Sequence, residues 1–257
     1  MAVPEVENLI AFLRDHASSG EFNFVSLRGG KYQITKESQQ AFLELYCKAA
    51  PFFTEQNATS LTWRTPKQDF LPLLFDIDLQ VAEEVAFSNE TFIELAQMIM
   101  FYVSSEIKDL GMGVVLTRKQ RCYPKGTVFK TGFHMFVFGI LVSKELALKI
   151  RNRILEGDLP RFLEQHHIIN PPHDVLDKSV CPFGKNGLVM LSDYKRERNT
   201  GKAYSIFFRG TYNYSTDDWN HPTEFQPEQT VTLLSEMRNI FWGWLWKTPK
   251  WPKFGDL

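Results

Sequence analysis

Two aspartates two residues apart are the first chemically suggestive feature of the sequence. Asp76 and Asp78 lie in the segment LPLLFDIDLQ, residues 71–80. On a β-strand such residues project from the same face, about 7 Å apart at Cα. Their carboxylates could converge on one or two hard divalent cations, which prefer oxygen ligands. An exposed strand face with two ordinary acids, or the D-x-D motif of a metal-dependent sugar transferase, would show the same pattern.

A lysine and a histidine four residues apart form the second candidate group. Lys130 and His134 lie in KTGFHMFVFGILV, an almost continuous apolar run that is typical of a central strand. The basic residues that lead into it are Arg118, Lys119, Arg121, Lys125 and Lys130. This grouping favours a polyanion site, with charge from Lys130 and a directed hydrogen bond from His134. A solvated basic loop beside a buried core histidine is the alternative interpretation.

The third candidate group lies around a short predicted strand at 187–191. Asp177 precedes this strand, and three cations follow it, Lys195, Arg196 and Arg198. A carboxylate before the strand and a lysine after it could complete a site for a metal ion and a triphosphate. No zinc site is expected from the nearby His and Cys residues, because no Cys pair of structural-zinc spacing accompanies them.

The overall composition restricts the class of protein. The chain has 257 residues, of which 44% are hydrophobic and 23% charged, as in folded globular proteins. Its 29 basic against 30 acidic residues exclude a protein that coats nucleic acid by bulk charge. We expect no membrane-spanning segment, since no apolar run approaches about 18 residues. We expect no secretory signal, since the N-terminus carries acidic residues early and lacks a basic region. The three widely spaced cysteines favour a reducing, intracellular setting.

The elements that must position these groups alternate between helix and strand. Helices are expected over 5–16, after a cap at Thr35, from Asn89 to near Gly111, from a cap at Ser143 to Gly157, and over 226–247. Strands are expected in a hairpin that turns at Gly29 and Gly30, and at 71–80, 112–117, 132–142, 187–191 and 204–208. Without repeats or linkers, we expect a single domain over 1–257, with a mixed α/β or α+β fold and a motif-bearing core at about 70–210.

Taken in order, the three groups resemble the archaeo-eukaryotic primase superfamily. The likeness is nearest to the primase domain of the primase-helicases of poxviruses and other large DNA viruses. The family pattern is hhFDhDh, then K-[ST]-x-F-H-h-h-h, then LDxxVY…LR…GSxK. Here these stand as LLFDIDL (73–79), KTGFHMFV (130–137) and LDKSVC…GLVML…SDYK (176–195).

The resemblance implies a primase/polymerase catalytic core with an RRM-like β-sheet flanked by helices. It implies primer synthesis by template-directed nucleotidyl transfer from NTP or dNTP on single-stranded DNA, with Mg²⁺ or Mn²⁺ in a two-metal site. Carried over by position, the metal ligands would be Asp76, Asp78 and Asp177. The triphosphate ligands would be Lys130, His134 and Lys195.

The chain departs from the family pattern at three positions. Gly132 stands where many relatives have Ser, and Cys181 replaces a Tyr. Val189 replaces an Arg, so that cation must be absent or supplied from elsewhere, for which Lys185 is a candidate. Template DNA would follow the basic residues at 118–130 and 185–202, namely Arg118, Lys119, Arg121, Lys125, Arg196 and Arg198.

Several alternatives stay open at the level of sequence. A D-x-D sugar transferase would need the same acidic pair but no Lys-x₃-His strand. A non-catalytic RRM-like nucleic-acid-binding module should carry aromatic residues, not acids, on its central face. Relatives continue into a helicase, so a helicase domain or subunit is an expected partner and the chain could be the N-terminal part of a longer protein. If the chain is viral, it would act in the host-cell replication compartment, in the cytoplasm or the nucleus.

Overall fold

The alternating segment at 71–80 forms the long strand β4 (Phe70–Val81), as predicted. In the computed structural model the described residues are 3–64, 69–108, 112–118, 122–176, 188–190, 192–194 and 204–225. The helical end expected at 226–247 lies outside them. None of the described helices is long and apolar enough to cross a membrane.

Tertiary contacts divide the chain into two compact units. The first comprises Met1–Pro66, Lys185–Ser205 and Gln226–Trp251. The second comprises Lys67–Gly184, Ile206–Phe225 and Pro252–Leu257. Because neither unit is a continuous stretch, no single cut in the chain separates them. The single domain expected over 1–257 stays a prediction.

In the described part of the first unit, two helices and a 3₁₀ turn pack beside a four-stranded sheet. Its helical elements are α1 (Pro4–Asp15), α2 (Gln39–Ala49) and η1 (Ala50–Phe52). Its strands, in sheet order, are β2 (Lys31–Tyr32), β1 (Phe24–Ser26), β3 (Leu61–Trp63) and β8 (Leu188–Val189). The hairpin predicted at Gly29 and Gly30 forms, and both glycines take φ of 110°, which favours glycine.

The cap predicted for α2 is wrong by three residues. Ser38, not Thr35, is the residue before the helix. The backbone N–H of Ser38 donates to the carbonyl oxygen of Thr35 at 3.2 Å. Thr35 therefore begins the turn that precedes the helix and does not cap the helix itself.

A buried carboxylate joins two distant segments of the first unit. Asp193 accepts hydrogen bonds from the Thr59 hydroxyl at 2.6 Å and from the backbone N–H groups of Ser60, Leu61 and Tyr194 at 2.9, 2.8 and 2.8 Å. Burial raises the pKa of Asp193, and these hydrogen bonds oppose that shift. The residue lies in the SDYK segment of the third motif, and its contacts give it a structural role beside β3.

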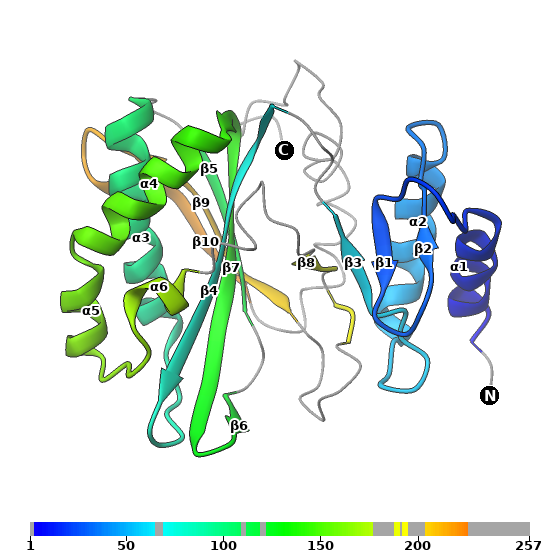
Figure 1. Ribbon diagram of the computed structural model, residues 1–257, viewed down its shortest axis with the longest axis horizontal. Helices are drawn as coiled ribbons and strands as arrows, with labels where there is room; N and C mark the ends of the chain where they lie inside the picture. Colours follow the sequence, from blue (N-terminus) through cyan, green and yellow to red (C-terminus); the bar gives the residue numbers. More distant parts are fainter. Residues whose placement is uncertain are drawn as a thin grey trace. The chain divides into compact units, whose positions relative to one another are not determined.

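The described part of the second unit contains a six-stranded sheet with four helices on one side (Figure 1). The sheet order is β10 (Asp218–Glu224), β9 (Ser205–Asn213), β5 (Met112–Arg118), β7 (Val128–Ser143) and β4, and β6 (Tyr123–Lys125) also pairs with β7. The helices are α3 (Asn89–Ile107), α4 (Lys144–Glu156), α5 (Leu159–Gln165) and α6 (Pro172–Val175). Strands β4, β5 and β6 all pair antiparallel with β7, and the predicted α+β class is confirmed.

Local signals set most of the helix ends in this unit. The Ser143 side chain accepts a hydrogen bond from the Leu146 backbone N–H and Gly157 ends α4, as predicted. Helix α3 ends at Ile107, earlier than expected, because Lys108 takes φ of 55° and serves as its left-handed cap.

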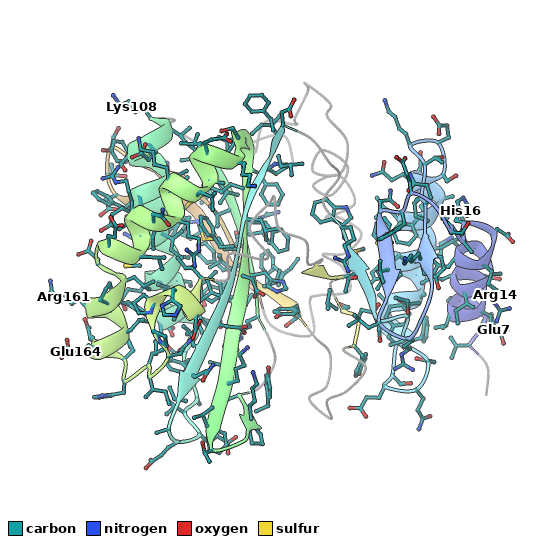
Figure 2. All side chains as sticks on the ribbon, in the orientation of Figure 1. Glu7, Arg14, His16, Lys108, Arg161 and Glu164 are labelled. Atoms are coloured by element: carbon teal, nitrogen blue, oxygen red, sulfur yellow. The ribbon has the colours of Figure 1, made fainter. Side chains whose placement is uncertain are left out.

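Arg161 and Glu164 project from α5 on the side away from the sheet (Figure 2).

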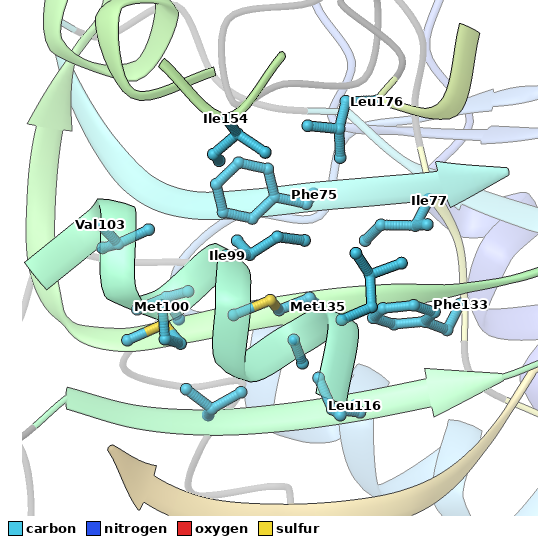
Figure 3. Packing of buried hydrophobic residues seen from close by; sticks show 14 of the residues in the cluster. Phe75, Ile77, Ile99, Met100, Val103, Leu116, Phe133, Met135, Ile154 and Leu176 are labelled. Carbon is cyan, nitrogen blue, oxygen red and sulfur yellow. The ribbon is translucent and has the colours of Figure 1, made fainter. Parts of the chain in front are cut away.

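The main core lies between the sheet and these helices. Alternate residues of β4, including Phe75 and Ile77, are buried against α3 residues such as Ile99 (Figure 3). Phe133 and Met135 of β7 join the same cluster. The strand residues between them must project from the opposite face of the sheet, since side chains alternate along a strand. This alternation places the first two candidate groups, Asp76 and Asp78 on β4 and Lys130 and His134 on β7, on that opposite face.

Candidate active site

The acidic pair is displayed on the sheet face opposite the helices. Asp76 and Asp78 alternate with the buried residues Phe75, Ile77 and Leu79. Their side chains are 15% and 20% exposed, so both are partly enclosed but accessible. Two adjacent carboxylates in such a setting repel each other unless cations lie close by.

The register between β4 and β7 brings the first and second motifs together. Asp76 pairs directly with His134 across the two strands, and Asp78 pairs with Gly132. The Nε2 atom of His134 lies 3.3 Å from Oδ1 of Asp76, and the imidazole is only 2% exposed. The two sequence motifs, more than fifty residues apart, therefore lie next to each other on one face of the sheet.

Lys130 supplies the cation beside the second aspartate. Its Nζ atom donates to Oδ2 of Asp78 at 2.5 Å. Lys130 pairs in register with Gln80, one step along the same face from Asp78. The lysine predicted to bind phosphate thus contacts a carboxylate predicted to bind metal.

Gly132 makes this close strand contact possible. A Cβ atom at this position would lie 2.0 Å from the carbonyl oxygen of Ile77, which is backbone and cannot move aside. The φ of Gly132 is 157°. Position 132, where the family pattern has Ser, therefore requires glycine here, because β4 lies too close to leave room for a side chain.

Residues 169–176, which follow α5, run along the edge of β4 that does not pair with β7. We call β4, which carries Asp76 and Asp78, the acidic strand. The Ile169 backbone N–H donates to the Gln80 carbonyl oxygen at 2.9 Å. The Asn170 side chain accepts from the Gln80 N–H and donates to the Asp78 carbonyl oxygen, both at 2.9 Å. Leu176 then forms an antiparallel bridge with Ile77, between the two aspartates.

A buried arginine holds the end of this segment. The Arg151 guanidinium is part of a residue only 7% exposed, and it donates to the carbonyl oxygens of Leu176 and His173. Sequence reasoning missed Arg151 and Asn170. The sequence did contain one indication that Arg151 is buried, because it falls within the apolar stripe of its helix. The other residues of that stripe, Ala147, Ile150 and Ile154, are all buried.

Of the predicted basic site residues that the structure describes, not all lie beside Asp76 and Asp78. Arg118 pairs in register with the core residue Phe133, and its guanidinium lies 5.9 Å from the ring centroid of Phe92 and 5.6 Å from that of Phe207. Burial lowers the pKa of Arg118, although Glu90 opposes this. Lys125 is exposed on β6. The remaining predicted site residues, namely Lys119, Arg121, Asp177, Lys185, Lys195, Arg196 and Arg198, lie outside the described residues.

The carboxylate oxygens of the acidic pair are suitable ligands for a hard divalent cation. Asp76 and Asp78 offer carboxylate oxygens of the kind that Mg²⁺ and Mn²⁺ prefer. Within the described ranges no group of three or more His, Cys, Asp or Glu side chains could hold a metal ion. One or two carboxylates, completed by waters and substrate phosphates, are a common ligand set for Mg²⁺ in proteins.

Comparison with known proteins identifies the family. The family model for the N-terminal AEP (archaeo-eukaryotic primase) domain of the C962R protein matches residues 23–207. This span includes the acidic strand, the Lys-His strand and the segment that follows them. No curated protein matches the chain. Since the match covers well over half of the sequence, the chain belongs to the family of C962R-type N-terminal archaeo-eukaryotic primase domains.

Proposed function

We propose that the chain is a template-directed nucleotidyltransferase that synthesises primers. A 3′-hydroxyl oxygen would attack the α-phosphorus of an NTP or dNTP, the bond to the β-phosphate oxygen would break, and pyrophosphate would leave. Family membership supports a primase-type, nucleotidyltransferase-like role. The observation that carries the proposal is the placement of Asp76, Asp78, His134 and Lys130 on one sheet face by the β4–β7 register.

Asp76 and Asp78 would hold Mg²⁺ or Mn²⁺, with Asp177 as a third ligand. The bridge between Ile77 and Leu176 supports this choice, because Asp177 follows Leu176 directly in the sequence. When bound, such ions lower the pKa of an attacking hydroxyl and neutralise charge on the phosphates.

Two side chains would bind the triphosphate. Lys130 would offer an ammonium group to phosphate oxygens, and His134 a ring N–H. Lys195 and Lys185 would add charge near the leaving pyrophosphate, whose stabilisation lowers the barrier. Single-stranded template would bind through its phosphates along the basic segments, hence in a salt-sensitive way.

A primer-synthesis assay tests the proposal directly. The 257-residue chain is incubated with single-stranded DNA, labelled NTPs or dNTPs, and Mg²⁺ or Mn²⁺. We expect labelled oligonucleotides whose formation requires both template and divalent ion. Turnover of a nucleotide sugar without template would instead indicate a sugar transferase. DNA binding with no incorporation and no dependence on divalent ions would indicate a non-catalytic binding module.

The Lys130–Asp78 contact predicts opposite effects of one substitution on two ligands. In Lys130→Met the ammonium group no longer competes for Asp78, so Mn²⁺ alone should bind about threefold to tenfold more tightly. Nucleoside triphosphate should bind about tenfold or more weakly, since a charge-assisted hydrogen bond is lost. Both affinities can be measured by calorimetry.

Lys149→Met is the matched control for this prediction. Lys149 lies on α4, is 63% exposed on its side chain and pairs with Glu106, so neither affinity should change. Weaker Mn²⁺ binding by Lys130→Met, or unchanged binding of the nucleotide, would contradict the role assigned to Lys130.

A further inference from the structure

The side chain of Asn170 bonds to the backbone of the acidic strand on both sides of Leu79. Its Oδ1 atom accepts from the Gln80 N–H and its Nδ2 atom donates to the Asp78 carbonyl oxygen, both at 2.9 Å. Asn170 is only 6% exposed, and Leu79 is buried. One side-chain amide therefore makes the two contacts that the backbone of a neighbouring strand would make.

The sequence around Asn170 explains why a side chain takes this task. The Ile169 N–H donates to the Gln80 carbonyl oxygen at 2.9 Å, but Pro171 and Pro172 follow Asn170 and have no N–H to donate. The backbone of this segment therefore cannot continue a regular ladder of hydrogen bonds along β4. An asparagine amide donates and accepts from one planar group, as a peptide does, whereas Ala and ionised Asp cannot do both.

These contacts restrain the backbone of Asp78 on the edge of β4 that faces away from β7. On the other edge Asp78 pairs in register with Gly132, where the two strands approach too closely for a Cβ atom. Asp78 also lies close to Val81, where β4 ends, and strand ends open at the lowest cost in free energy. Asn170 thus holds the end of the strand that carries the second aspartate.

We infer that Asn170 is a positioning residue for the metal site, which keeps the Asp78 carboxylate where it can bind a divalent cation together with Asp76. This inference rests on the proposed function, because it takes Asp78 as a metal ligand. Asn170 acts through the backbone of the acidic strand and not on the reacting groups. Replacement of groups that orient metal ligands typically changes metal affinity by about 10- to 100-fold.

Two measurements on the nucleotide-free chain test this role. Asn170→Ala should weaken binding of Mn²⁺ alone about tenfold or more, read by the electron paramagnetic resonance signal of the free ion. Without any metal, the Gln80 amide should exchange its hydrogen with solvent faster in this variant, because its acceptor is gone. Wild-type protection of that amide in Asn170→Ala would show that the contact does not restrain the strand.

Tyr102→Phe is the matched control for general loss of stability. The Tyr102 hydroxyl donates to the Asp158 carboxylate at 2.7 Å and accepts from the Asp158 N–H at 3.0 Å. Like Asn170→Ala, this change removes one donated and one accepted hydrogen bond, but its contacts lie on α3 and at the start of α5. The two variants should lose similar amounts of melting temperature, and Tyr102→Phe should bind Mn²⁺ as the wild type does.

A double-mutant cycle tests whether Asn170 acts through Asp78. In the Asp78→Asn background, Asn170→Ala should cause little further loss of Mn²⁺ affinity, because both changes affect the same ligand. A full further loss in that background would overturn the positioning role.

Asn170→Asp decides the outcome if Asn170→Ala does not fold. It keeps an acceptor for the Gln80 N–H but loses the donor to the Asp78 carbonyl oxygen. Charge alone predicts tighter Mn²⁺ binding for this variant, whereas loss of positioning predicts weaker binding. Tighter or unchanged binding would contradict the inference.

The failure of this inference can be distinguished from the failure of the proposed function. If Asp78→Asn loses Mn²⁺ binding while Asn170→Ala folds and retains it, the positioning role is wrong and the proposed function stands. If Asp76→Asn and Asp78→Asn both retain Mn²⁺ binding and nucleotide incorporation, the proposed function itself fails.

Discussion

Replacement of Asp76 by Asn is expected to lower nucleotide incorporation by about 10³-fold or more, which corresponds to about 4 kcal/mol in the activation barrier. Asn has nearly the same shape but lacks the negative charge that a divalent ion requires. It also removes the charge that faces Nε2 of His134 at 3.3 Å. Initial rates on single-stranded template, with Mg²⁺ and with Mn²⁺, measure the effect.

Asp69→Asn is the control for this substitution. Asp69 immediately precedes β4 and is exposed, so the same chemical change there should leave the rate unaltered. A thermal melt of both variants should match that of the wild type, because Asn fits the space of Asp. Incorporation by Asp76→Asn at a rate near that of the wild type would contradict the proposed role of Asp76 as a metal ligand.

Replacement of Gly132 by Ala is expected to have the largest effect on stability, about 3 kcal/mol, with a drop in the melting temperature of about 10 °C. The new Cβ would lie 2.0 Å from the Ile77 carbonyl oxygen and 3.2 Å from the Asp78 Cα atom. Relief requires β4 to move away from β7, which would also separate Asp78 from Lys130. The serine found in many relatives would meet the same clash here and should add no phosphate contact.

Gly139→Ala tests whether the clash, and not the loss of glycine, causes the effect. Gly139 lies on the same strand with φ of 90°, and among the described residues no neighbouring atom would come within 4 Å of a Cβ there. Its replacement should cost only about 1 kcal/mol of backbone strain. Equal losses of stability in the two variants, measured by chemical denaturation, would show that the close approach to Ile77 is unimportant.

Sequence alone was sufficient where the controlling interactions are local. The alternation of β4 and the polar cap at Ser143 both depend on neighbouring residues, and both predictions are confirmed. The same alternation correctly places the two aspartates on one face. By contrast, a left-handed cap at Lys108 is unusual for a lysine, so the predicted end of α3 extended too far.

Contacts between distant segments could not be predicted in the same way. Arg118 belongs to a basic run, yet its guanidinium lies over two aromatic rings, one of them 89 residues further along the chain at Phe207. Asp193 is held by Thr59, and Arg151 by the end of α6. A local pattern shows the charge of such a residue but not the partner that determines its role.

The attachment of 169–176 has one more consequence, for the behaviour of the strand in solution. β4 is the last strand in the order of its sheet, and an outermost strand offers unpaired backbone groups to other chains. The Asn170 side chain and the Leu176 bridge occupy part of that outer side, at Asp78, Gln80 and Ile77. The segment therefore also covers part of the exposed edge of β4 and disfavours edge-to-edge pairing with other chains there.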